Sequence, residues 1–228
     1  MRLGGEAIRR AFLDMRSRYG PQSWWPAETR LEVLVGAVLT QGTRWRNVEL
    51  AISRLRAADV MSLDGLMALP LDCLAELIRP SGYFNVKARR LANLCKFIQQ
   101  RNGEAGLEAL DTPALRRALL SVNGIGPETA DDILLYAFER PVFVVDNYTR
   151  RLFRRLGWIV GDEPYDDLRG AVELAVGGDT ALFNELHALV VFHGKHVCRP
   201  NPRCQGCCLA SRCPGRGDGR NSLSSGRT

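Results

Sequence analysis

The sequence predicts an all-α protein, for two reasons. Apolar side chains recur at helical spacing through most of the chain, as at Leu31, Leu34, Val35 and Val38. The β-like run PVFVVD, at 141–146, stands alone, with no second strand spaced to pair with it. Proline and glycine punctuate the helical stretches, and we find no repeat of fixed period. The fold should therefore consist of short helices joined by turns.

The helices are expected in a simple order along the chain. The first is amphipathic and carries Ile8, Phe12 and Met15 on one face. Further helical patterns cover residues 31–38, 48–55, 63–69, 71–78, 88–99, 112–122, 130–137, 150–156, 164–176 and 179–192. Pro113 suits the opening turn of its helix. Residues 215–228 carry almost no apolar side chains, so we expect a disordered tail.

The chain is moderately basic. It has 228 residues, with 31 lysines and arginines against 25 aspartates and glutamates, a formal charge of +6. Such a balance either solubilises the surface or serves a partner rich in phosphate. No stretch reaches the roughly 18 apolar residues of a membrane span, and the N-terminus lacks the apolar core of a signal peptide. We therefore expect a soluble, cytoplasmic protein.

The seven cysteines are distributed unevenly. Cys73 and Cys95 lie singly in helical patterns, where we expect buried, reduced core residues. The other five stand at 198, 204, 207, 208 and 213. In an intracellular chain such crowding favours a metal site. Four thiolates this close can hold a [4Fe–4S] cluster or a tetrahedral zinc ion, and the spacing does not decide between the two.

A short turn joins two of the predicted helices. It reads Asn123, Gly124, Ile125 and Gly126, followed by Pro127. Two glycines in this spacing permit backbone angles that a side chain would block, and let a phosphate approach main-chain N–H groups at the start of the next helix. Ile125 can plug the core. An ordinary helix–helix turn is the alternative for this pattern.

Four segments together resemble the endonuclease III, or helix-hairpin-helix, superfamily of DNA glycosylases. VNGIGPETADDILLYAF and the following VFVVD resemble its hairpin and catalytic aspartate, LEVLVGAVLTQGTRWRNVE its first core helix and loop, RPSGYFNVKARRL its second DNA-facing loop, and the last cysteines its iron–sulfur motif. The resemblance implies a six-helix domain at 28–138 containing the hairpin. A second helical domain, formed by 1–27 and 139–214, would carry the cluster loop, with the active-site cleft between the domains.

The resemblance assigns catalysis to Asp146. Breaking an N-glycosidic bond builds positive charge on the sugar, and a nearby carboxylate stabilises that charge or positions water. The apolar residues before Asp146 place it at the edge of a core. A helix N-cap is the alternative role, and both roles can hold at once.

Glu128 stands where lyase members of the family have a lysine, whose amine forms a Schiff base with the sugar. Glutamate cannot form that imine. The departure implies a monofunctional glycosylase that uses water as nucleophile and leaves an abasic site. A solvated first-turn glutamate is the alternative reading of the same residue.

The base pocket is expected to contain Trp24, Trp25, Pro26 and Trp45. These residues resemble the 3-methyladenine glycosylase branch of the superfamily, which also has glutamate at the lysine position but can lack the cluster cysteines. Indole faces attract a cationic alkylated purine once it is flipped out of the duplex. Core packing is the other use of these tryptophans. An endonuclease III-like glycosylase for oxidised pyrimidines or mismatched thymine, and a non-catalytic iron–sulfur DNA-binding protein, stay open as alternatives.

The resemblance also implies DNA contacts and cluster ligands. Gln41 would fill the gap left by the flipped base, and Tyr83 would wedge the opposite strand; a surface glutamine and a half-buried tyrosine are the alternatives. The remaining DNA contacts are expected from Lys87, Asn123, Gly124, Ile125 and Gly126. The cluster ligands would be Cys198, Cys204, Cys207 and Cys213, although the first gap holds five residues here and six in the family. Cys208 offers a competing register, but Cys207 gives the last two gaps of the family motif. The expected partner is double-stranded DNA with a damaged base, bound by a monomer.

Overall fold

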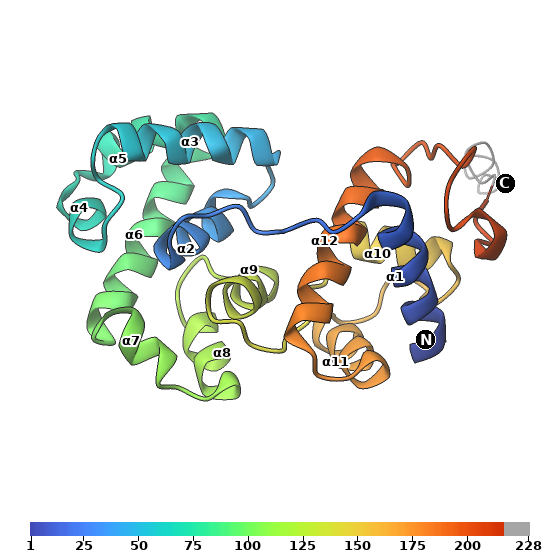
Figure 1. Ribbon diagram of the computed structural model, residues 1–228. Coiled ribbons are helices and arrows are strands. Elements are labelled where there is room, and N and C mark those ends of the chain that lie inside the picture. Colours follow the sequence, from blue (N-terminus) through green and yellow to red (C-terminus); the bar gives the residue numbers. More distant parts are fainter. Residues whose placement is uncertain (217–228) are drawn as a thin grey trace, which may run out of the picture. The chain divides into compact units, whose positions relative to one another are not determined.

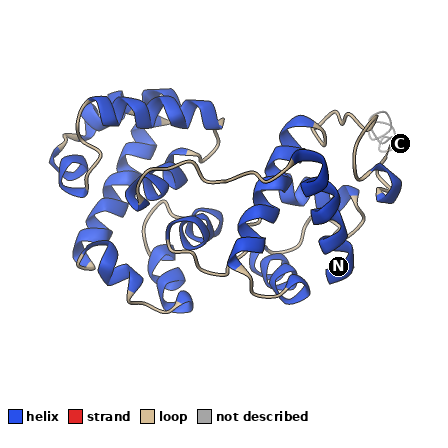
Figure 2. Cartoon of the chain, viewed as in Figure 1, coloured by secondary structure: helices blue, strands red, loops and turns tan. Residues whose placement is uncertain are grey.

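The computed structural model describes residues 1–216, and within this range every regular element is helical (Figure 2). The predicted all-α fold is confirmed. The tail predicted to be disordered lies outside the described residues from position 217 onward. The elements are α1 (Gly5–Tyr19), α2 (Arg30–Leu39), α3 (Trp45–Ala57), α4 (Leu63–Ala68), α5 (Leu71–Leu77), η1 (Arg79–Ser81), α6 (Phe84–Gln100), α7 (Gly103–Glu108), α8 (Thr112–Leu120), α9 (Pro127–Asp132), η2 (Ile133–Ala137), α10 (Asn147–Arg155), α11 (Tyr165–Val176), α12 (Thr180–His196) and η3 (Ala210–Arg212).

The chain divides into two compact units. The first, here called the terminal unit, consists of Met1–Trp24 and the described residues from Pro141 onward. The second, here called the central unit, is Trp25–Arg140 and contains the whole range expected for the six-helix domain. Among residues 1–216 no helix combines the length and the apolarity that a membrane crossing requires.

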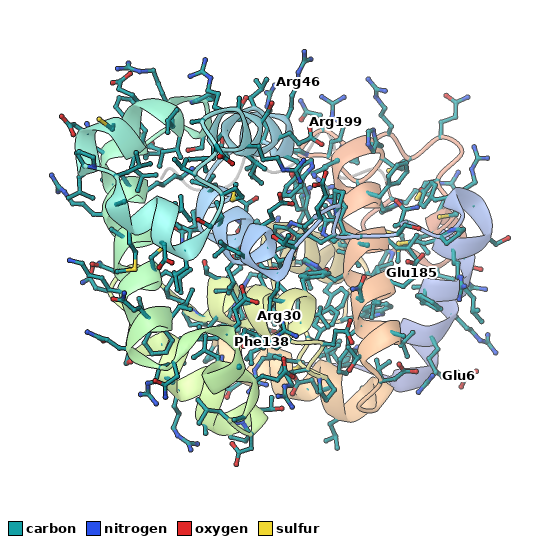
Figure 3. The ribbon with its side chains drawn as sticks, turned by 60° about the vertical axis from the view of Figure 1, so that its left-hand side comes forward. Glu6, Arg30, Arg46, Phe138, Glu185 and Arg199 are labelled. Carbon is teal, nitrogen blue, oxygen red and sulfur yellow. The ribbon has the colours of Figure 1, made fainter. Side chains whose placement is uncertain are left out.

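The central unit is built around α2, which packs against α3, α6, α9 and η2 (Figure 1). All residues of α2 from Leu31 to Leu39 are buried, including the charged Glu32. Arg56 of α3 forms a forked pair with that carboxylate, with both N–O distances 2.5 Å. A buried charge is tolerated only when it is paired in this way. At the start of α2, Arg30 lies 4.8 Å from the ring centre of Phe138 (Figure 3).

The terminal unit is organised by α12, which packs against α1 and α10 (Figure 1). The β-like run at 141–146 is buried but forms no strand. Two of its main-chain donors instead meet side chains of α11: Phe143 N donates to Glu173 Oε1 at 2.9 Å, and Val145 N to Tyr165 Oη at 3.4 Å. Buried backbone groups must find partners, and α11 supplies them here without a sheet.

The expectation for the isolated cysteines is half right. Cys95 is buried in α6, as expected, whereas Cys73 is exposed. The short helix α5 buries Leu74 and Ala75, so position 73 lies on its other side. A seven-residue helix offers too few positions for its buried face to be read from periodicity.

Candidate active site

The glycine turn joins α8 to α9 in the central unit. Gly124 has φ +98°, and a Cβ at this position would meet Arg90 Cγ at 2.2 Å. Both the backbone angle and the space therefore require glycine here. Ile125 is 5% exposed, so it plugs the core as the sequence suggested. Asn123 and Gly126, on either side of it, are exposed.

A buried ion pair joins the two helices of the hairpin. Arg116 of α8 donates from Nε to Asp131 Oδ1 at 2.7 Å and from Nη2 to Asp131 Oδ2 at 3.1 Å. The Asp131 side chain is 0% exposed and that of Arg116 is 15% exposed. Such a fork fixes direction as well as distance, so it holds α8 and α9 in one relative orientation.

Gln41 is tied to the hairpin rather than free at the surface. Its Nε2 donates to Gly124 O at 3.1 Å and to Thr129 Oγ1 at 2.9 Å, and Arg90 Nη1 donates to its Oε1 at 2.5 Å. Thr129 was not anticipated from the sequence. Any movement of Gln41 toward DNA must exchange these three hydrogen bonds for new ones.

Tyr83 has the geometry of an exposed tip. Its side chain is 77% exposed, and its φ of +46° lies in the left-handed region, which is uncommon outside glycine. It directly precedes α6, whose fourth residue is Lys87. The alternative of a half-buried tyrosine does not fit this exposure.

Lys87 does not lie where a phosphate contact would need it. The residue is 1% exposed, and its Nζ donates to Leu39 O at 2.8 Å and to Ser81 O at 2.7 Å. Burial, and then the charge of Arg90, lowers the pKa of Lys87 to about 8. The expected DNA contact of this side chain is therefore wrong. The helical pattern placed position 87 on a basic face, but the residue lies one turn into α6, on its buried side.

The predicted pocket tryptophans fall into two groups. In the central unit, Trp25 packs edge-on against Trp45 at 5.0 Å and lies 5.2 Å from Tyr136 between ring centres. Pro26 is exposed. In the terminal unit, Trp24 lies 5.3 Å from Lys195 Nζ, measured to the ring centre. Tyr136 was not predicted from the sequence, in which it stands among the apolar residues of the stretch 130–137.

Asp146 caps α10 in the terminal unit and also faces a histidine. Its Oδ1 accepts from Thr149 N at 2.7 Å, and its Oδ2 lies 3.8 Å from His187 Nε2. The residue is 9% exposed. Burial acts to raise the pKa of Asp146, but His187 and the Thr149 N–H outweigh it, so the net pKa lies below the ordinary value. The carboxylate is thus buried yet ionised, which lets it stabilise a nearby cation.

Four of the five C-terminal cysteines line one cavity of the terminal unit, and the fifth does not. Cys198, Cys204, Cys207 and Cys213 all line one cavity, together with Arg155 and His193. Cys208 does not line it; its Sγ lies 3.6 Å from Tyr19 Oη. Among residues 1–216, no three His, Cys, Asp or Glu side chains converge closely enough to hold a single metal ion. Thiolates around one zinc would lie about 3.8 Å apart, given a Zn–S bond of about 2.3 Å.

Over residues 1–216 the regular elements are all helices, and a buried, ionised carboxylate follows the hairpin; both features are typical of the helix-hairpin-helix class of DNA glycosylases. Residues 35–176 match the family described as HhH-GPD superfamily base excision DNA repair protein. The chain belongs to this family and is a DNA glycosylase of base excision repair.

Relatives of several kinds match the chain. A putative DNA repair glycosylase of Methanocaldococcus jannaschii is 46% identical, covering 91% of this chain and 96% of the relative. Endonuclease III of Thermotoga maritima is 30% identical, covering 83% and 87%. The structure of the H. pylori 3-methyladenine DNA glycosylase MagIII, bound to 1,N6-ethenoadenine, has a TM-score of 0.73 at 31% identity, covering 85% of this chain and 98% of that one. A non-covalent endonuclease III–DNA complex has a TM-score of 0.79 at 24% identity, covering 93% and 96%, which speaks to the fold alone.

Proposed function

We propose that this glycosylase is monofunctional and removes an alkylated purine such as 3-methyladenine by hydrolysis. The observation that carries the proposal is Glu128, an exposed carboxylate in the first turn of α9. A lyase needs an amine at the hairpin helix to attack the sugar, and glutamate offers none. Water is the nucleophile that remains for the second half of the reaction.

Asp146 is the proposed catalytic residue. The bond between C1′ and the purine nitrogen breaks, and its electron pair leaves with the base. A cationic alkylated purine departs as a neutral molecule, while the positive charge passes to the sugar. The ionised Asp146 stabilises that charge, water adds at C1′, and its proton is lost to solvent. The product is an abasic site on an uncut strand.

The base preference is supported by the aromatic cluster of Trp25, Trp45 and Tyr136. Electron-rich ring faces favour a cation by roughly 0.5–2 kcal/mol, depending on desolvation. A neutral oxidised pyrimidine carries no charge that such faces would select. The relatedness to endonuclease III of Thermotoga maritima keeps oxidised pyrimidines as the second candidate.

The proposal is tested with a panel of duplexes containing 3-methyladenine, thymine glycol or a thymine–guanine mismatch. We expect release from the 3-methyladenine duplex, with strand breaks seen only after hot alkali, and no covalent complex trapped by borohydride. Release of thymine glycol with a trapped complex would instead support an endonuclease III-like lyase. Binding to every duplex without release from any of them would support a non-catalytic protein.

We also propose that Cys198, Cys204, Cys207 and Cys213 hold a [4Fe–4S] cluster. The four thiols line one cavity, and four thiolates are the usual ligand set of such a cluster. Arg155 Nη1 lies 3.2 Å from Cys198 Sγ, so a cation faces the negative charge that the bound thiolates would carry. When bound, the cluster would brace the loop 198–213; it has no part in breaking the glycosidic bond.

Two neighbouring cysteines test the ligand assignment. Cys207→Ser is expected to abolish the visible absorbance of thiolate-bound iron and to lower the iron content. Cys208→Ser is expected to keep both. The two residues are adjacent and half-buried, so the pair is matched. The opposite outcome would move the ligand to Cys208.

A further inference from the structure

Lys87 connects two loops of the central unit from the inside. Its Nζ bonds Leu39 O, the last residue of α2, which stands two positions before Gln41. The same Nζ bonds Ser81 O, the last residue of η1, which stands two positions before Tyr83. Its main-chain N–H donates to Tyr83 O at 3.0 Å. One residue thus bonds both loops: the Gln41 loop through its side chain, and the Tyr83 loop through its side chain and its main chain.

The chemistry of this contact argues against simple core filling. Burying an ammonium group costs more than burying leucine or methionine of similar size. The cost is offset here because both acceptors are carbonyls at helix C-termini, which lack helical partners and carry partial negative charge. An apolar side chain could occupy the space, but it could not bind two carbonyls and so fix the distance between them.

The loop before Gln41 is also fixed at its other end. Arg90, one turn further along α6, bonds Gln41 and packs against Gly124 of the hairpin. Lys87 and Arg90 therefore place three segments on one helix: the Gln41 loop, the Tyr83 loop and the hairpin turn. All three belong to the central unit, so their relative placement is set before any ligand arrives.

We propose that Lys87 is a positioning residue for base extrusion, which sets the spacing of Gln41 and Tyr83 so that both enter an opened duplex together. The inference rests on the proposed function, in which these two side chains contact the DNA. A preset spacing removes the cost of ordering two loops when DNA binds. Without the ammonium, each loop would find its place separately, and the flipped state would lose stability while binding to undamaged DNA would not.

The test compares Lys87→Met with Cys95→Ala in the full-length protein. Cys95 is buried in the same helix, about two turns beyond Lys87, so this control reports the effect of a weakened α6. We expect Lys87→Met to lower the single-turnover rate of base release at least about tenfold. The fluorescence rise of a 2-aminopurine beside the lesion should fall in parallel. The Kd for undamaged duplex should not change, and Cys95→Ala should resemble the unaltered protein in all three measurements.

A second substrate separates positioning from misfolding. When the lesion stands in an unpaired bulge, extrusion is already accomplished, and Lys87→Met should recover most of its rate. Equal rates for Lys87→Met and Cys95→Ala on paired duplexes would overturn the inference while leaving the proposed function intact. A lack of recovery on the bulge would overturn it as well. If the unaltered protein releases no base, the proposed function fails, and this inference fails with it.

Discussion

Asp146→Asn is expected to lower the rate of base release by about 10²–10³-fold while leaving DNA affinity unchanged or slightly higher. The magnitude is that of removing one preorganised electrostatic stabiliser from a transition state. The substitution is well suited to this residue because asparagine caps helices as well as aspartate does. The bond from Thr149 N is kept, and only the charge is lost. Single-turnover release and a binding titration on the same duplex measure the two quantities.

The control for Asp146→Asn is Asp179→Asn. Asp179 caps α12 in the same unit, accepting from Leu182 N at 3.1 Å. The same chemical change at a cap without a proposed catalytic role should leave base release unaltered. If the two variants behaved alike, Asp146 would be a cap only, and the proposed mechanism would be wrong.

The lowered pKa of Asp146 also predicts how base release and stability should depend on pH. The folded pKa lies below its ordinary value, so the side chain stays ionised above about pH 4. Its charge stabilises the folded state above that pH, and this contribution is lost as the pH falls through the folded pKa. Base release should therefore show no loss from protonation of Asp146 anywhere in the neutral range.

The sequence was informative where the signal is local. Helical spacing predicted the fold class, and the two glycines around Ile125 predicted a turn whose backbone does require Gly124. Asp146 before Asn147 was a recognisable cap. In each case the evidence lies within a few neighbouring residues, and tertiary contacts did not override it.

The sequence could not predict partners that are distant along the chain. His187 stands 41 positions after Asp146 (187 − 146), and no sequence pattern connects the two residues. Lys87 looked like a surface cation because lysine is seldom buried, and only the carbonyls of Leu39 and Ser81 explain why it is. For the adjacent Cys207 and Cys208, by contrast, the spacing of the family motif favoured Cys207, and Cys207 is the one that lines the cavity.

Asp131→Asn is expected to destabilise the protein by about 3–5 kcal/mol, the usual effect of removing one partner from a buried ion pair. Asparagine keeps the size of the side chain, but its amide cannot accept both N–H groups that Arg116 presents. The guanidinium charge would then lie beside α9 without the carboxylate. Thermal unfolding should show a midpoint lowered by roughly 6–20 °C, given 2–4 °C per kcal/mol for a chain of this size.

Two further variants decide whether the effect comes from the buried pair. Glu76→Gln breaks the ion pair with Arg79, whose side chains are 61% and 54% exposed, and should leave the midpoint unchanged because solvent screens such pairs. The double variant Arg116→Met, Asp131→Leu removes both charges and should recover most of the lost stability, since neither charge of the pair is left without the other. If Asp131→Asn shifted the midpoint no more than Glu76→Gln does, the buried pair would not be what holds the hairpin helices together.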